Sequence, residues 1–412
     1  MKKIITLFKH AFLVCVLLFA FSAMAQRSVN TYSDSWGKQG FTLLKSDNAS
    51  VQVNFSISEF ALNTKNINGE NLQNIELSGC FLPNDEGAPD LPGNGRYIAI
   101  PQGAVATCKI LASRTETFHN VNMAPAFKIP WDNDKSPLKY VKSSKYFSKG
   151  ALYPEKFVQI SEPTQLRGVD VVMLGITPFQ YNPVTKDLIV YRDLKVEVSY
   201  KGGNGHFGDD RLRSRWFDPI LQDAILNQES LPTIDYGKRA TEMAGQKEAG
   251  CEYLIIVPTN PEFAQWADSI KEFRTLQGIN TQIKTLTEVG GNTSTAIKNY
   301  ITNAFNTWTI PPVAVLLLGD YGSSATNSIT SPMWDNYCVS DNIYSDVNND
   351  MMPDIVFSRI TANNASQLQV MVSKGLNYER NPPTSADYYH HPITALGWQT
   401  ERWFQLCSEI VG

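Results

Sequence analysis

The sequence predicts a multidomain protein in which an antiparallel β-sandwich precedes an α/β part with a doubly wound, mainly parallel sheet. The first observation is a series of short segments, up to about residue 203, in which apolar and polar residues alternate between turn residues. The second is the apolar run Val313–Leu318, which fits a strand buried on both faces. The third is the regular alternation of strand-like and helix-like segments after Cys251.

The first 25 residues predict a secretory signal peptide. Lys2 and Lys3 precede an apolar run from Ala11 to Phe21, and Ala23-Met24-Ala25 provides an A-x-A cleavage site. A short membrane anchor is the alternative, but the run is shorter than the ~20 residues that a bilayer requires. We therefore expect the mature chain to be secreted or held at the cell surface, and no later segment is apolar enough to span a membrane.

Composition excludes some classes of function. The 412 residues suggest two or three domains, and the net charge of -4 argues against a nucleic-acid partner. Five cysteines remain once Cys15 leaves with the signal, and Cys80 and Cys108 are the candidates for a disulfide because both lie in the β-rich region. The absence of a C-x-x-C motif argues against a zinc site.

Residues 26–203 are expected to form the β-sandwich. Apolar residues alternate with period two in Val51–Phe55, Leu188–Tyr191 and Leu194–Tyr200. Proline and glycine separate these segments, as expected for turns between antiparallel strands. His119 is isolated in this region and is expected to be structural.

Residues 204–250 are expected to link the two folded parts. A short helix is predicted near Phe217–Asn227, and the following stretch is polar and lacks apolar periodicity. Exposed basic residues in such a linker suit proteolytic maturation, so Arg239 is the preferred cleavage point and the Arg211–Arg215 cluster the second. A solvated connector with incidental charges remains the alternative.

Residues 251–412 are expected to form the α/β part. Strand and helix patterns alternate here, which requires right-handed crossovers between parallel strands. The central strand ends at Gly319-Asp320, at the carboxyl edge where sites of such sheets are built. The predicted elements are strands at Tyr253–Val257, Thr281–Leu286, Ile355–Phe357 and Ile393–Trp398, and helices at Glu262–Gln277, Ser294–Thr307, Ala365–Tyr378 and Glu401–Val411.

An acidic loop follows the central strand. Asp346, Asn348 and Asp350 have D-x-N-x-D spacing, and Asp354 lies close behind. Carboxylate and amide oxygens converging on one point suit Ca²⁺, which would brace the loop. The loop is not an EF-hand, because Met351 stands where a glycine is expected and no glutamate closes the loop. A polar turn with solvated side chains is the alternative.

Several short motifs occur in the order found in gingipain-type cysteine peptidases. They are Tyr253–Pro258, Gln277-Gly278, Leu316–Asp320, Ser340–Tyr344, Pro353–Arg359 and Asn377–Asn381. Residues 251–412 resemble the N-terminal part of that family's peptidase domain, and residues 26–203 are similar to its propeptide. The resemblance implies a β-sandwich propeptide, a caspase-like peptidase fold, and a zymogen from which the propeptide is removed.

The same resemblance implies a cysteine nucleophile and a histidine base, and neither matches a residue of this sequence. His390 and His391 match no His-Gly motif. Cys407 is expected to be a buried structural residue, and Cys338 is disfavoured as nucleophile because it lies in a loop with no histidine near in sequence. Glu401 is the nearest positional match to the family's orienting acid, with helix capping as its alternative role. The sequence as given is therefore expected to lack the segment that carries the catalytic pair.

The resulting hypothesis is a secreted cysteine endopeptidase zymogen that acts on protein or peptide substrates, with its own propeptide as inhibitor and the export machinery as a partner. The alternative is a non-catalytic secretion or surface-binding factor with the same fold. Nucleotide binding is disfavoured, because Gly319–Gly322 lacks the G-x-G-x-x-G spacing.

Overall fold

The computed structural model describes residues 27–80, 85–128, 136, 138–243, 250–391 and 393. The chain divides into two compact units: unit 1 contains residues 1–96, 107–161 and 173–199, and unit 2 contains residues 97–106, 162–172 and 200–412. The sequence predicts one boundary near residue 203. In the structure, residues 97–106 and 162–172 also belong to unit 2. The predicted signal peptide lies outside the described residues.

Unit 1 is built mainly from antiparallel strands. β4 pairs with β1 and β5, and a second sheet has the order β11-β12-β3-β2, with β7 also paired to β12. A further sheet has the order β6-β10-β8, with β9 also paired to β10. The elements are β1 (Arg27–Thr31), β2 (Gly40–Ser46), β3 (Ser50–Ser56), β4 (Glu59–Ile67), β5 (Glu70–Glu76), β6 (Asn94–Ala99), β7 (Ala104–Phe118), α2 (Ser144–Phe147), β8 (Val158–Ile160), β9 (Thr164–Leu166), β10 (Val169–Ile176), β11 (Phe179–Asn182) and β12 (Asp187–Gly202).

The period-two patterns of the sequence correspond to strands with one buried face. Val196 and Val198 on β12 are fully buried, whereas the intervening Glu197 is not. Phe60 on β4 contacts Phe179 on β11 at a ring-centroid distance of 5.6 Å, so side chains of two sheets meet in the core of this unit.

The expected disulfide between Cys80 and Cys108 is not formed. Both cysteines are free, with Cys80 buried and Cys108 partly exposed on β7. Burial raises the pKa of the Cys80 thiol to about 11, and burial also raises that of Cys108. Both thiols are thus protonated near neutral pH, as expected of structural cysteines.

Unit 2 contains a four-stranded parallel sheet with the order β14-β13-β15-β20. The apolar run that organises the sequence forms β15, between β13 and β20, as predicted. Two short pairs, β16-β17 and β18-β19, follow in the connection from β15 to β20. The strands are β13 (Tyr253–Val257), β14 (Thr281–Thr285), β15 (Ala314–Leu318), β16 (Asp320–Tyr321), β17 (Ser328–Ile329), β18 (Met333–Trp334), β19 (Cys338–Val339) and β20 (Val356–Ile360).

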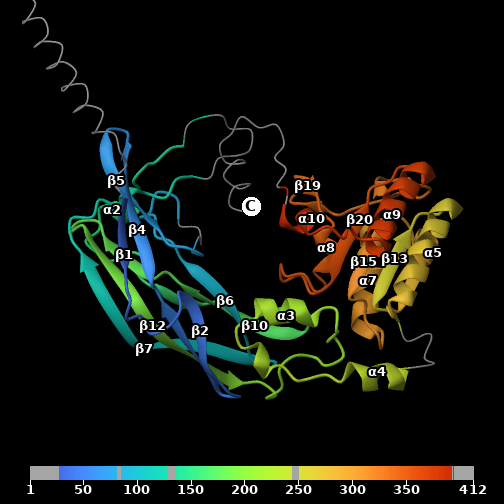
Figure 1. The fold of residues 1–412 in the computed structure, drawn as a ribbon, viewed down its shortest axis with the longest axis horizontal. Coiled ribbons are helices and arrows are strands. Elements are labelled where there is room, and N and C mark those ends of the chain that lie inside the picture. Colours follow the sequence, from blue (N-terminus) through green and yellow to red (C-terminus); the bar gives the residue numbers. More distant parts are fainter. Residues whose placement is uncertain are drawn as a thin grey trace, which may run out of the picture. The chain divides into compact units, whose positions relative to one another are not determined.

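Helices cover both faces of this sheet. Ile255 on β13 packs with α5 and α9, whereas its neighbour Leu254 packs with α6 and α7, since successive strand residues face opposite sides. Figure 1 shows α5 and α9 beside β13 and β15. The helices are α5 (Pro261–Leu276), α6 (Leu286–Val289), α7 (Ser294–Thr307), α8 (Asn342–Ser345), α9 (Ala365–Arg380) and α10 (Ala386–His390).

Capping residues explain where the main helices begin. The side chains of Asn260, Thr293 and Asn364 accept hydrogen bonds from backbone N–H groups in the first turns of α5, α7 and α9. Thr285 and Glu288 form a reciprocal capping box at α6. The boundaries of α5, α7 and α9 agree with the predicted ones to within two residues, because the cap residue and the apolar period indicate the same helix start. The predicted helix Glu401–Val411 and most of the predicted strand Ile393–Trp398 lie outside the described residues.

The stretch expected to be a linker is partly folded in unit 2. It contains α3 (Asp218–Ala224), a 3₁₀ helix at Gln228–Ser230 and α4 (Tyr236–Met243). Phe217 and Leu221 are buried in a core cluster with Val313, which directly precedes β15. No helix among the described residues is long and apolar enough to cross a membrane.

Candidate functional site

The acidic loop, residues 346–354, joins α8 to β20, and its side-chain oxygens accept hydrogen bonds from its own backbone N–H groups. Asp346 Oδ1 and Asn348 Oδ1 accept hydrogen bonds from Asp350 N at 3.1 and 3.2 Å, and Asp346 Oδ2 accepts one from Met351 N at 3.1 Å. Asn349 and Met351 have positive φ angles of 62° and 73°. Short polar side chains that bind nearby backbone N–H groups support such tight turns.

Asp350 connects this loop to a strand far away in the sequence. Its Oδ2 accepts hydrogen bonds from Thr164 Oγ1 at 2.6 Å and from Gln165 N at 2.7 Å, both on β9. Its Oδ1 accepts one from Met352 N at 3.0 Å. The carboxylate therefore joins two segments that the sequence analysis assigned to different domains.

Asp354 and Arg167 form the buried centre of the same contact. Asp354 is 2% exposed, and its Oδ1 accepts a hydrogen bond from Arg167 N at 3.0 Å. Arg167 is 1% exposed, and its Nη1 donates to the carbonyl oxygens of Pro312 and Asp354 at 3.0 and 2.9 Å. Its Nε donates to Leu212 O at 2.7 Å. One guanidinium thus fixes the backbone before β15, the acidic loop and the segment after β12.

A tight hairpin turn places Arg167. β9 ends at Leu166 and β10 begins at Val169, so Arg167 and Gly168 form a two-residue loop with φ angles of 47° and 75°. Positive φ at both central residues is typical of hairpin turns whose twist matches the flanking strands. A side chain at Gly168 would also meet Leu212 Cδ1 at 2.5 Å, so both conformation and space favour glycine there.

Burial dominates the electrostatics of this pair. It raises the pKa of Asp354 to about 6, helped by the nearby Asp350 and Asp346 charges and opposed by the N–H groups of Val347 and Arg167. Burial lowers the pKa of Arg167 to about 10, which leaves the guanidinium charged at neutral pH.

Arg211 and Arg215, in the segment between β12 and α3, bind backbone carbonyl groups of the α/β part. Arg211 Nη1 donates to Phe305 O at 2.8 Å and Trp308 O at 3.1 Å, at the C-terminal end of α7. Arg215 Nη2 donates to Gly278 O at 2.7 Å, after α5. Phe305 lies in the last turn of α7 and Trp308 is its C-cap, so Arg211 supplies a donor to carbonyl oxygens at a helix end.

The oxygens proposed as Ca²⁺ ligands are already engaged in this arrangement. Asp346, Asn348, Asp350 and Asp354 all accept hydrogen bonds from N–H or O–H groups. No group of three or more His, Cys, Asp or Glu side chains that could hold a metal ion occurs in the described part of the chain. The calcium prediction from the loop's spacing is not tested by the structure and stays a prediction.

The remaining predicted site residues lie apart from this contact. Arg239 is on α4, where its Nη1 donates to Arg213 O at 2.9 Å and its Nη2 to Asp210 O. Glu401 and Cys407 lie outside the described residues. His391 Nδ1 lies 2.8 Å from Asp387 O, at the end of α10, and Cys338 is exposed on β19. Cys251 is buried, and burial raises its thiol pKa to about 12, which makes it unsuited to nucleophilic attack.

Comparison with known proteins gives partial matches to gingipains of Porphyromonas gingivalis. Lys-gingipain HG66 is 24% identical over 363 residues, which is 84% of this chain and 20% of that protein. Gingipain R2 of strain W83 is 23% identical over 308 residues, which is 73% of this chain and 39% of that protein. The chain thus spans about a fifth to two-fifths of the length of these curated relatives.

Among solved structures, the complex of the RgpB pro- and mature domains from the same organism matches with a TM-score of 0.42 and 22% identity, over 47% of this chain and 99% of that one. Two family models match the chain in succession: Propeptide_C25 over residues 33–231 and Peptidase family C25 over residues 246–400. The chain belongs to the gingipain-type cysteine peptidase precursors of family C25.

The C25 family models place the two sides of the contact between Arg167 and the acidic loop in different parts of the precursor. Thr164, Arg167 and Arg211 lie in the part matched by the propeptide model, whereas Asp350 and Asp354 lie in the part matched by the peptidase model. Unit 2 of the C25 chain therefore contains propeptide segments bound to the peptidase sheet.

Sequence reasoning found the acidic half of this contact and missed the basic half. The spacing of the acidic loop is visible in the sequence, but its partners are 183 or more residues away, and Arg167 belongs to no motif. A usable signal was the R-x-R-x-R pattern at Arg211, Arg213 and Arg215, which was interpreted only as a cleavage site.

Proposed function

We propose that this chain is the precursor part of a secreted, gingipain-type cysteine endopeptidase, in which the propeptide segments of unit 2 hold the opening sheet of the peptidase domain. The supporting observation is the buried Arg167, which joins propeptide and peptidase parts through two hydrogen bonds to Asp354 and one to Pro312 O. Burial keeps the thiols of Cys80 and Cys251 protonated at neutral pH, so neither is suited to be the nucleophile.

The experiment is a separation of the two parts after cleavage in α4. A peptidase specific for basic residues is used to cut the purified chain, and size-exclusion chromatography then measures whether the propeptide fragment stays bound. We expect a stable complex in the natural chain and at least about tenfold weaker association in Arg167→Gln, because hydrogen bonds to a charged group contribute about 1.5–3 kcal/mol.

Two further variants make this result interpretable. Thr164→Val removes one hydrogen bond to Asp350 and should weaken association less, without burying an unpaired charge. Arg27→Gln removes an exposed arginine of unit 1 that pairs with Glu76, and it should have no effect. Equal association in all four proteins would show that this contact does not hold the propeptide.

The proposal also covers the fold of each part and the activity of the complete enzyme. We propose that unit 1 is a β-sandwich and that the parallel sheet belongs to a caspase-like peptidase fold, with Glu401 as the acid that orients the catalytic histidine. Substrates would be proteins or peptides, the propeptide would act as inhibitor, and export would follow signal-peptide cleavage after residue 25. The alternative, a non-catalytic secretion or surface-binding factor, would be favoured if the parent protein shows no thiol-dependent hydrolysis.

Calcium binding at the acidic loop is a separate proposal that rests on the D-x-N-x-D spacing. Because Asp350 is held by Thr164 and Gln165, an ion would have to displace these donors. Calorimetry with CaCl₂ tests this directly: a binding heat that disappears in Asp346→Asn supports it, and the absence of any heat rules it out for the intact precursor.

A further inference from the structure

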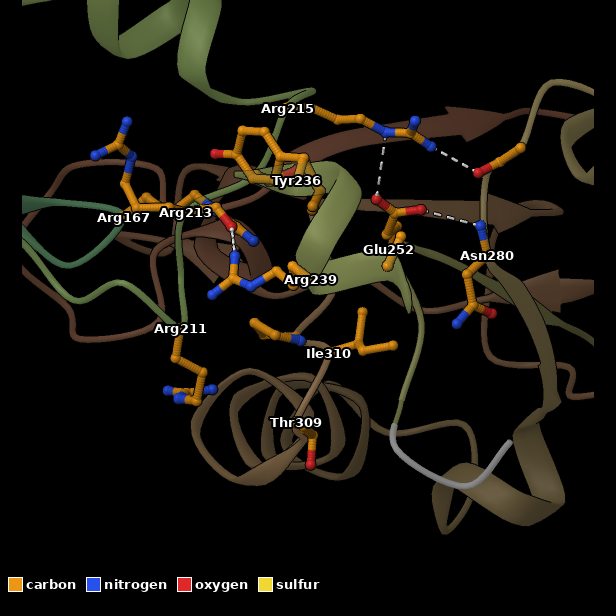
Figure 2. Close-up of a pocket in the computed structure, with 15 residues that line it drawn as sticks. Arg167, Arg211, Arg213, Arg215, Tyr236, Arg239, Glu252, Asn280, Thr309 and Ile310 are labelled. Carbon is orange, nitrogen blue, oxygen red and sulfur yellow. Dashed lines mark hydrogen bonds and ion pairs between the residues drawn. The ribbon is translucent and has the colours of Figure 1, made fainter. Parts of the chain in front are cut away.

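A second feature of unit 2 is a cavity of about 240 Å³ lined by an unusual number of arginines. Its charged lining side chains are those of Arg167, Arg211, Arg213, Arg215, Arg239 and Glu252. Figure 2 shows these side chains together with Tyr236, Asn280, Thr309 and Ile310. Five arginines thus line the cavity, with one carboxylate residue among them.

The cavity lies at the amino edge of the parallel sheet. Glu252, Asn280 and Val313 line it, and each directly precedes a strand of the sheet: β13, β14 and β15. Sites of α/β sheets that bind substrates are usually built at the opposite, carboxyl edge. This position argues for a binding role that is separate from peptide-bond cleavage.

Carboxylates neutralise only some of these arginines. Arg213 binds Asp218 through Nε and Nη2 at 2.8 and 2.9 Å. Arg215 Nε lies 3.9 Å from Glu252 Oε1, and Arg211 Nη2 lies 3.8 Å from Asp209 Oδ2. Arg239, by contrast, donates only to the carbonyl oxygens of Arg213 and Asp210 among the contacts that the structure gives its side chain. Carbonyl oxygens orient a guanidinium without cancelling its charge, so the cavity retains a positive field.

Arg167 adds an unsatisfied donor. Its Nη2 is buried and has no hydrogen-bond partner among the described residues, although the other two nitrogens of its guanidinium are bonded. The rings of Phe217 and Phe305 lie 5.1 and 5.4 Å from its central carbon, which favours the cation but supplies no acceptor. An unpaired buried donor on a charged group is costly, and the uncompensated charge of Arg167 adds to the positive field at the cavity that this residue lines.

We infer that this cavity is a binding site for a small multivalent oxyanion of the phosphate or sulfate class. Arginine forks suit the oxygens of such ions, and the cavity joins the Arg211–Arg215 segment, α4 and the sheet edge. A bound oxyanion would link these three elements and stabilise unit 2. The inference does not depend on whether the parent protein is a peptidase.

The test is thermal unfolding of the intact chain with increasing phosphate, at constant ionic strength set by chloride. The expected result is a saturable rise in melting temperature, because a ligand that binds only the folded state stabilises it by mass action. Sulfate serves as the second probe, and a rise with either ion supports the site. A rise no larger than that with chloride alone would overturn it.

Matched variants locate the ion. Arg239→Gln and Arg215→Gln should each raise the half-saturation concentration of phosphate at least fivefold. Arg239→Lys keeps the charge but loses the planar fork, so its half-saturation concentration should lie between those of the natural chain and Arg239→Gln. The control is Lys238→Gln, on the same helix, whose side chain is 72% exposed, pairs with Glu242 and is not part of the cavity lining. If Lys238→Gln weakens phosphate binding as much as Arg239→Gln, the effect is general surface charge and the inference is wrong.

Discussion

Thr164 Oγ1 donates a 2.6 Å hydrogen bond to Asp350 Oδ2 across 186 residues of sequence. The donor lies in the part matched by the C25 propeptide model and the acceptor in the part matched by the peptidase model. The two parts of the precursor are therefore joined inside one compact unit, next to the buried Arg167–Asp354 contact.

The first prediction concerns this bond. Thr164→Val keeps the shape of the side chain but leaves Asp350 with one donor fewer, so the free energy of unfolding should fall by about 1–2 kcal/mol. Denaturant unfolding of unit 2 is the measurement, and Thr233→Val, at an exposed position, is the control. A double-mutant cycle with Asp350→Asn should give a coupling energy, and independent effects would contradict a direct bond.

The second prediction concerns pH. The pKa of Asp354 is raised to about 6, mainly by burial, so the folded state binds this proton more tightly than the unfolded chain does. Its contribution to stability is fully present below pH 4 and is lost as the pH rises through about 6. Between pH 4 and pH 7 the natural chain should therefore lose stability relative to Asp354→Asn, on the order of 2 kcal/mol.

The measurement for this pH effect is urea unfolding of both proteins across that range. Asp268→Asn, at an exposed position on α5, serves as the comparison and should run parallel to the natural chain. Parallel curves for Asp354→Asn as well would mean that burial does not perturb this carboxyl group.

The third prediction concerns the core of the parallel sheet. Leu317→Ala should destabilise the protein by about 2–5 kcal/mol, because Leu317 on β15 is fully buried in the cluster with α6 and α7. Leu276→Ala, at the end of α5, should cost well under 1 kcal/mol, because that side chain is 85% exposed. Thermal unfolding of the two variants compares them directly.

The fourth prediction concerns maturation. A bond after Arg239 lies within α4, and peptidases bind substrates in extended form, so α4 must open before cleavage. The φ angle of Gly237 is not in the positive range, and a Cβ atom added there would meet only Asp235 Oδ1, at 3.4 Å. Gly237→Ala should therefore stabilise α4 by up to about 1 kcal/mol and slow cleavage by about two- to fivefold.

Electrophoresis with N-terminal sequencing measures this rate and the cleaved bond. We expect the product to begin at Ala240. A product that begins elsewhere would reject Arg239 as the maturation point, and an unchanged rate would show that opening of α4 does not limit cleavage.

The long helices and the sheet strands of the described α/β part were predictable because their signals are local, whereas the short helices α6, α8 and α10 were not predicted. Apolar runs such as Val313–Leu318, cap residues such as Asn260 and the helical spacing of Phe263, Ile270 and Phe273 are contained within single segments. Burial on two faces then leaves a helix-covered parallel sheet as the compact arrangement, and the structure has it.

Only the tertiary structure decided how the propeptide and peptidase parts meet. Arg167 carries no pattern in the sequence, and its acceptors, the carbonyls of Leu212, Pro312 and Asp354, are backbone groups that every residue possesses. The acidic loop was visible for its carboxylates, but the partners of those carboxylates follow from chain topology. The sequence shows the chemical type of each side chain, whereas the pairing of buried polar groups depends on which segments the fold brings together.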